Sequence, residues 1–425
     1  MQPSVAMPNG RSPGQTSTAP PPPPPPPSAA PTVQTAANGK RPIALLAMLA
    51  GFSVANLYSA QPLLNAMAQD LSLPPAWSGA VVAATQLGYA LGLIVLVPLG
   101  DRLPRRHLLA VAAAGTAAAL AAVPWTATAL ALGLALAAVG VLAVAIQLSV
   151  AFAADLAPSQ RTGRAIGAVT AGVALGVVAA RLLPGPIAAS LGWRSVYAAS
   201  AGIAAALAGL LWWRLPGEAT RPCPSTPLPG VLALVFNHPV LRQRGPAATV
   251  NFAMLGLLWT ALPLAAGAAS DPQTPRTIPL IGLVGLAGAL AATWAGRAAD
   301  SGRDHAVITG AALTACGAWC LLATPHNGIW GLIAGTALLD AAVQAAHVTH
   351  QRSLLRTGAH ARSRLVAAYM LFYASGTAAG ATAATWLLAH GGWRAGCQLG
   401  LALGLASLAQ ALWLRSKASP APRSA

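Results

Sequence analysis

The chain has 425 residues, of which 56% are hydrophobic and only 8% are charged. Soluble domains carry about 25% charged residues, so the composition excludes a large water-exposed globule. The net charge of +17 would suit a nucleic-acid-binding protein, but the cations are spread between long apolar segments rather than gathered in a basic patch. We therefore expect an all-α membrane protein that lies in a lipid bilayer and binds no nucleic acid.

The first 40 residues are rich in Pro, Ser, Ala and Gln and include eight consecutive prolines, Pro20–Pro27. A polyproline tract favours an extended helix without internal hydrogen bonds and cannot build a core. We predict a disordered cytoplasmic tail over residues 1–40.

Apolar segments long enough to cross a bilayer recur along the rest of the chain. A transmembrane helix needs about 20 mostly apolar residues, and twelve such segments form two sets of six. We predict an N-terminal half over 41–213, a cytoplasmic linker over 214–245, a C-terminal half over 246–415 and a cytoplasmic tail over 416–425. Within the linker, Gly230–Arg244 is expected to form a short helix on the membrane surface. The predicted spans are 43–67, 77–99, 107–127, 129–153, 165–188, 194–213, 246–267, 278–296, 305–324, 328–350, 363–389 and 393–414.

The two halves repeat each other at a spacing of about 200 residues. The tripeptide Gly-Trp-Arg at 192–194 returns at 392–394, and Asp101, after the second span, returns as Asp300 after the eighth. A parallel repeat of two six-helix halves occurs in one large class of transporters, whose substrate site lies between the halves near the midplane.

Short motifs indicate a family. The stretch Pro98–Arg106 reads Pro-Leu-Gly-Asp-Arg-Leu-Pro-Arg-Arg and resembles the signature loop between the second and third helices of the major facilitator superfamily; Gly296–Arg303 is a shorter copy. The segments Gln61–Leu64 and Leu339–Val348 are similar to a bacterial efflux-type branch of that superfamily. The resemblance implies its twelve-helix fold and proton-coupled export of a small molecule through the inner membrane. We expect a monomer.

Asp340 is the only acidic residue that we place deep within a span. At 100° per residue, Asp340, Gln344, His347 and Gln351 fall within about 60° of one another on one helix face, over a length of about 16 Å. Polar groups inside a membrane are costly and are functional candidates by default. The stripe is either a cavity wall, where Asp340 or His347 binds a proton and the glutamines contact substrate, or a polar seam between helices.

Arg181 is the only cation that we place within a span, so it must pair with an acid or reach water. It either attracts an anionic substrate or neutralises a carboxylate in the same half. Gln147 corresponds to His347 in the repeat, which favours a place on the cavity wall. The full set of further cavity candidates, whose alternative roles are interhelical hydrogen bonds or core packing, is Asn56, Gln61, Gln86, Gln147, Asn251, Tyr369 and Tyr373.

A charge cluster lies at the predicted cytoplasmic surface, too far out to contact substrate at the midplane. The family resemblance implies that it latches the two halves together in the outward-facing state, with Asp155 as a partner for an arginine. The alternative is a solvated loop, since surface ion pairs individually contribute little. The residues are Asp101, Arg102, Arg105, Arg106, Asp155 and Asp300.

Glycines spaced four residues apart predict close helix packing at three places. The pairs are Gly88 with Gly92, Gly172 with Gly176, and Gly376 with Gly380.

Three functions compete at this point. The first is a proton-coupled exporter, and the second is an importer or uniporter on the same fold. The third is a membrane-embedded enzyme or sensor, which we disfavour because the chain has no nucleophile motif, no phosphate-binding loop and no large soluble output domain. The four cysteines form no metal-ligand pattern, so we expect no metal and no cofactor.

The distribution of cations predicts that both termini are cytoplasmic, because cytoplasmic loops carry an excess of Lys and Arg. In this orientation 21 of the 25 cations lie inside, and Arg194, Arg276 and Arg394 lie outside. A reporter fused after Ala425 is expected to be active only in the cytoplasm. A fusion that is active only in the periplasm would overturn the orientation.

Overall fold

Prolines and glycines between apolar segments determine where the helices of this chain begin and end. In a computed structural model, every described residue belongs to one compact unit, Gly39–Ala425, and this described part contains helices but no strand. The tail predicted over residues 1–40 lies outside the described residues, except for Lys40, at which the first helix begins. The structure describes residues 40–158, 161–215, 230–267, 282–300, 302–324, 328–357 and 362–417.

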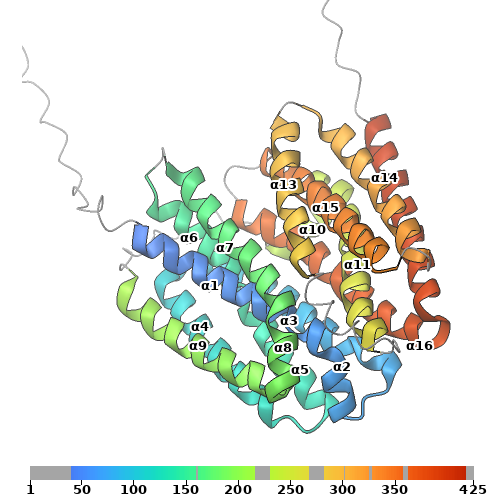
Figure 1. Cartoon of the computed structure of the whole chain (residues 1–425). Helices are drawn as coiled ribbons and strands as arrows, with labels where there is room; N and C mark the ends of the chain where they lie inside the picture. The colour runs from blue at the N-terminus through green and yellow to red at the C-terminus, as the bar shows by residue number, and fades with distance from the viewer. Residues whose placement is uncertain are drawn as a thin grey trace, which may run out of the picture. The chain divides into compact units, whose positions relative to one another are not determined.

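Six predicted spans form the first half, drawn blue to green in Figure 1. The first span is broken after Tyr58, because Pro62 has no N–H to donate to the Tyr58 carbonyl and its ring crowds that turn. Pro184 begins a new helix in the fifth span in the same way. The elements are α1 (Lys40–Tyr58), α2 (Ala60–Asp70), η1 (Pro75–Trp77), α3 (Gly79–Gly100), α4 (Arg105–Ala122), η2 (Val123–Trp125), α5 (Ala129–Leu142), α6 (Ala145–Leu156), α7 (Thr162–Leu182), α8 (Pro184–Leu191) and α9 (Trp193–Arg214).

The second half, yellow to red in Figure 1, is preceded by a short helix. This helix covers Val231–Asn237 only, so the predicted surface helix over Gly230–Arg244 is too long; Pro239 already begins the next span. The elements are α10 (Val231–Asn237), α11 (Pro239–Gly267), η4 (Gly282–Val284), α13 (Gly285–Asp300), α14 (Asp304–Ala323), α15 (Gly328–Leu355) and α16 (Arg362–Lys417).

The helix count agrees with the twelve-span prediction once two elements are considered. Among the described residues, ten helical segments are long and apolar enough to cross a membrane. One of them, α16, contains two predicted spans separated at Gly392, whose φ of 64° lies in the left-handed region that favours glycine. The described part of α13 has 16 residues and is not among the ten. Each predicted span therefore has a helical counterpart.

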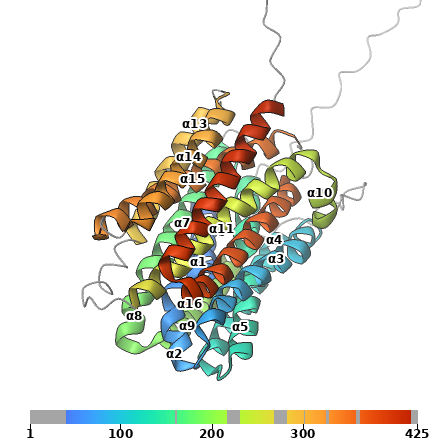
Figure 2. The same ribbon diagram turned by 90° about the vertical axis from the view of Figure 1, so that its right-hand side faces the viewer.

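The two halves meet along a seam between α3 and the first part of α16, which pack side by side, as the orange-red and light-blue helices of Figure 2 show. We call the end of the bundle at which α3 and α6 end and α4, α7 and α16 begin the basic end, because Arg105, Arg106, Arg161 and Arg164 lie there. The opposite end is the far end. There, α2 packs against α11, and the Thr385 hydroxyl donates a hydrogen bond to the Ala76 carbonyl at 3.0 Å.

The glycine pairs are sites of close backbone contact, as predicted. A Cβ on Gly172 or Gly176 would collide with the α1 backbone, at Ala47 and Gly51 respectively. In the second half the same relation holds between α16 and α11, where Gly376 faces Thr249 and Gly380 faces Ala253. Gly88 and Gly92 of α3 likewise face the α5 backbone, at Ala137 and Val141.

This contact predicts that Gly176→Val lowers the free energy of unfolding by about 1–3 kcal/mol, because an overpacked helix contact forces the backbones apart. Gly167→Val is the matched control on the same helix, since nothing lies within 4 Å of a Cβ built there. Thermal unfolding of both variants in detergent measures the effect. Equal unfolding temperatures for Gly176→Val and the wild type would contradict the prediction.

Candidate functional site

An ion pair joins the two halves in the interior of the bundle. Arg181, near the end of α7, places Nη2 3.4 Å from Oδ1 of Asp340 in the middle of α15. The side chains are 10% and 2% exposed, and among the described side chains Asp340 is the one acid that is buried. Asp340 and Arg181, the acid and the cation that the sequence analysis placed within spans, therefore neutralise each other.

Aromatic and backbone surfaces enclose this pair. The Arg181 guanidinium lies over the ring of Trp259 on α11, 3.5 Å from the ring centroid. The indole N–H of Trp259 lies near the carboxylate without reaching hydrogen-bond geometry. On α13, a Cβ at Gly285 would collide with Arg181 and one at Gly288 with Asp340, so both glycines leave room for the pair.

The partner of Arg181 differs from one sequence expectation. A counter-ion in the same half was one of the two alternatives, whereas the structure places the carboxylate in the other half. The two residues are 159 positions apart, and no spacing rule links them. Their contact depends on how α7 packs against α13 and η4, which in turn contact α15.

At the basic end the two halves enclose a cavity of about 820 Å³. Its walls come from α3, α6 and α7 of the first half and from α15 and α16 of the second. The cavity reaches Asp101 and Arg356 at the helix ends, and deeper inside it is lined by Gln147, His347 and Gln351. Three of the predicted cavity residues, one from the first half and two from the second, thus line the same cavity.

Tyrosines hold the two deeper polar groups in place. The Gln147 amide donates to the Tyr89 hydroxyl on α3 at 2.8 Å. Nδ1 of His347 lies 3.2 Å from the Tyr369 hydroxyl on α16, and the imidazole packs edge-on against Phe252, with ring centroids 5.1 Å apart. Because one side of each polar group is already bonded, the remaining side is available to the cavity.

The polar stripe of α15 therefore runs from the closed interior to the cavity. Asp340 is sealed in its ion pair, and Gln344, one turn further, is half-buried beside Gly288. His347 and Gln351 follow along the same helix and line the cavity. The first turn of the stripe thus lies in a seam between helices and its last turns line the cavity; proton binding and substrate contact by these residues stay predictions.

Sequence reasoning missed a second buried polar pair. Nη1 of Arg244 on α11 lies 3.4 Å from Nδ1 of His350, which is buried on α15 next to the stripe. Although His347, 60° away around the helix, lines the cavity, His350 is not among the lining residues. Its position within an apolar span was the only signal that could have identified it.

The other predicted cavity residues are not among those that line the cavity. Asn56 donates to the Phe52 carbonyl of its own helix at 2.9 Å, and Asn251 accepts from Ser407 at 2.9 Å. Gln61 and Gln86 are buried on α2 and α3, and neither amide atom of Gln86 has a hydrogen-bond partner. Tyr373 packs on Phe252, with ring centroids 3.9 Å apart, behind His347.

The charge cluster at the basic end divides into contacts with different partners. Asp101 of the first half accepts a hydrogen bond from Nε of Arg364 in the second half at 2.8 Å. Arg105 pairs with Asp155 within the first half. Arg102 is exposed, and Arg106 donates to the Trp212 carbonyl on α9 at 2.6 Å. The side chain of Asp300 lies outside the described residues.

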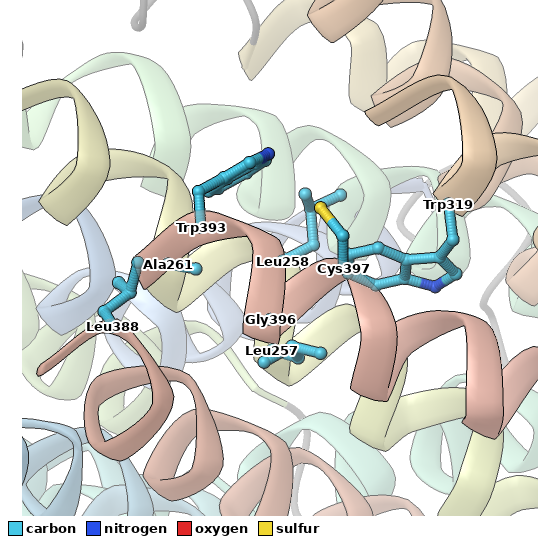
Figure 3. Close-up of a pocket in the computed structure, with 8 residues that line it drawn as sticks. All are labelled: Leu257, Leu258, Ala261, Trp319, Leu388, Trp393, Gly396 and Cys397. Carbon is cyan, nitrogen blue, oxygen red and sulfur yellow. The ribbon is translucent and has the colours of Figure 1, made fainter. Parts of the chain in front are cut away.

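A second, much smaller pocket lies within the second half, between α11, α14 and α16 (Figure 3). Its lining is apolar and includes Trp319, Trp393 and Cys397. With about 10 Å³, it has little more room than one water molecule and offers that water no polar partner, so we regard it as a packing gap. No cluster of three metal-ligating side chains occurs among the residues that the structure describes.

A family profile and the relatives of this chain both indicate a transporter. The profile of the Major Facilitator Superfamily matches residues 43–270. Over 368 residues, 86% of this chain and 93% of the relative, the chain is 34% identical to "Uncharacterized transporter YgaY" of Escherichia coli O157:H7. Over 409 residues, 91% of this chain and 90% of the relative, it is 31% identical to a "Probable transporter" of Streptomyces coelicolor.

Two solved structures share the fold. The human organic anion transporter MFSD10 matches with a TM-score of 0.65 and 17% identity, covering 88% of this chain and 99% of that chain. A bacterial homologue of the human lysosomal transporter Spinster, in an inward-facing and unoccupied conformation, matches with a TM-score of 0.61 and 15% identity, covering 89% and 95%. At these identities the similarity establishes the architecture alone.

The contact between Asp101 and Arg364 predicts a conformational role. Asp101→Ala is expected to reduce transport turnover severalfold and to leave substrate affinity nearly unchanged, because a contact between the halves acts on the populations of states. Turnover and affinity are measured in proteoliposomes. Asp304→Ala is the control, since Asp304 pairs with Arg356 within one half. Normal turnover combined with strongly weakened affinity would rule out the latch.

Proposed function

This chain belongs to the major facilitator superfamily, and we propose that it is a proton-coupled secondary transporter that exports a small molecule by alternating access. The observation that carries the proposal is the buried pair of Asp340 and Arg181, which joins the two halves away from the cavity. The chain is a multi-pass membrane transporter; the proton coupling, the direction and the cytoplasmic termini are proposed.

The pair links a protonation event to a conformational one. It exists only while the two halves touch around α7, α13 and α15, so opening the far end separates the charges. A separated Asp340 that binds a proton loses its attraction for Arg181, and closing the far end would then bury an unpaired cation. Such a burial is strongly unfavourable. Proton occupancy of Asp340 therefore shifts the balance between the two conformations.

The rest of the stripe offers a path for the proton towards the cavity. His347 follows Asp340 by seven residues, about 10 Å along the helix, and lines the cavity together with Gln351. Histidine changes charge near neutral pH in its ordinary state and is a common proton carrier. Asp340 passes its proton to His347 before the far end closes, which restores the ion pair with Arg181, and the proton then leaves at the basic end.

The predicted orientation supports export. With the basic end in the cytoplasm, as the excess of cations favours, the cavity would receive its substrate from the cell while the proton moves inwards. The cavity volume of about 820 Å³ lies within the usual range of about 300–1,000 Å³ for small-molecule sites. Apolar side chains such as Ile146, Val173 and Met370 line it beside Gln147, which favours a compound with both apolar and hydrogen-bonding parts.

An importer or uniporter remains the alternative, since it would use the same cavity without the same dependence on Asp340. A membrane-embedded enzyme is disfavoured because the threonine hydroxyls that line the cavity, Thr162 and Thr170, donate to the backbone carbonyls of Pro158 and Ile166 and are not bonded to a general base. Transport of an unchanged solute by the purified protein in liposomes distinguishes these classes.

The proposal predicts that Asp340→Asn abolishes accumulation driven by a pH gradient, measured as uptake into inverted vesicles with and without the imposed gradient. Asp70→Asn is the control, because it removes an exposed acid that pairs with Arg194 within the first half.

The single variant leaves Arg181 buried without its partner, and breaking such a pair costs about 3–5 kcal/mol. The double variant Asp340→Asn/Arg181→Gln removes both charges and tests coupling in a folded protein. If this folded double variant accumulates substrate against its gradient at the normal rate, Asp340 does not couple transport to protons, and His347→Gln is the next variant to test.

A further inference from the structure

A cluster of basic and aromatic side chains on the outer helices of the first half is not explained by transport. Arg106 and His107 lie at the start of α4, and Trp212, Trp213 and Arg214 lie at the end of α9, which packs against α4. We call these five residues the basic-aromatic patch. The indoles are highly exposed, at 57% for Trp212 and 75% for Trp213.

Direct contacts hold the patch together. Arg106 donates to the Trp212 carbonyl at 2.6 Å, and the His107 and Trp212 rings lie 5.7 Å apart. The Arg214 guanidinium lies over the Trp213 ring, 4.5 Å from its centroid. Cations are thus fixed beside two exposed indoles at one place on the surface.

These cations have no anionic partner in the part of the chain that the structure describes. Neither Arg106 nor Arg214 forms an ion pair there, and Nε of Arg106 has no hydrogen-bond partner. Two described acids near the basic end are engaged elsewhere, Asp101 with Arg364 and Asp155 with Arg105; Glu218, four residues after Arg214, lies outside the described residues. Within the described part of the chain, the patch therefore carries unpaired positive charge.

The patch also lies at a defined depth. The spans of α4 and α9 begin and end at these residues, which places the patch where the hydrocarbon layer meets the headgroups. Exposed Trp is typical of that interface, and basic pockets beside it bind anionic headgroups. A ligand here must be anionic and must present its charge at headgroup depth.

The second half has an acid where the first half has Arg106. Its corresponding helix, α14, begins with Asp304, whose carboxylate accepts from Ser353 at 3.3 Å and pairs with Arg356. The end of α16 still carries a cation over an indole, Lys417 over Trp413 at 5.3 Å. Both helix ends thus carry a tryptophan with a cation over it, and what distinguishes the first half among the described residues is the arginine of the neighbouring helix, Arg106, bonded beside that tryptophan.

We propose that the basic-aromatic patch is a binding site for an anionic phospholipid of the leaflet at the basic end. Arg106 and Arg214 contact the lipid phosphate, and the indoles of Trp212 and Trp213 cover the glycerol region. This site lies on the outer surface of the first half and is independent of the proton coupling proposed above.

Native mass spectrometry of the full-length protein with added dioleoylphosphatidylglycerol tests the proposal. An arginine beside an anionic headgroup contributes about fivefold to affinity, so Arg214→Gln should weaken retention about fivefold and Arg106→Gln/Arg214→Gln about 25-fold. Arg214 is exposed and makes no ion pair within the described residues, so the single variant keeps the test valid if the double variant unfolds. Arg415→Gln/Lys417→Gln at the end of α16 is the matched control and should retain the lipid like the wild type.

Three outcomes would overturn the proposal. Equal loss in the patch and control variants would indicate attraction by net charge alone. Equal retention of dioleoylphosphatidylcholine by the wild type would indicate an aromatic belt without headgroup selectivity. Displacement of the lipid by millimolar inorganic phosphate, with equal thermal stabilisation, would indicate a site for free phosphate.

Discussion

A permanent positive charge inside an apolar bundle is the constraint on which the rest of this structure depends. Arginine stays protonated at any physiological pH, so Arg181 needs a partner or water in every conformation. Asp340 supplies that partner from the other half, while Trp259 covers the face of the guanidinium. Because the charge cannot be removed, any movement that separates the halves at this point must hydrate Arg181 or give it another anion.

The surroundings of the pair are small or aromatic for the same reason. Gly285 and Gly288 let α13 approach the two charged groups, and larger residues at either position would push α13 away from α7 and α15. Elsewhere, glycines bring α7 to α1 and α16 to α11 with their backbones in contact. The two halves are thus tightly packed within themselves, and the contacts between them are fewer, which suits two units that move relative to each other.

The sequence predicts the spans and the glycine contacts. It also singles out Asp340 and Arg181, because a lone charged residue within an apolar segment can be recognised without a structure. It does not predict that these two residues meet, since the contact joins helices 159 residues apart. It also does not separate Gln147, which lines the cavity, from Asn251, which bonds to Ser407. Both are single amides on apolar helices, and only the rotation of each helix within the bundle distinguishes them.

The signature loop illustrates how one motif serves several neighbours. Asp101 and Arg105 line the cavity and pair with Arg364 and Asp155, whereas Arg106, the next residue, points to α9. Consecutive residues at a helix start differ by 100° in direction, so a run of arginines must face different surroundings. Of the two consecutive arginines, Arg105 therefore lines the cavity and pairs within the first half, whereas Arg106 bonds to α9. A count of the charges in the motif would assign both to the same role.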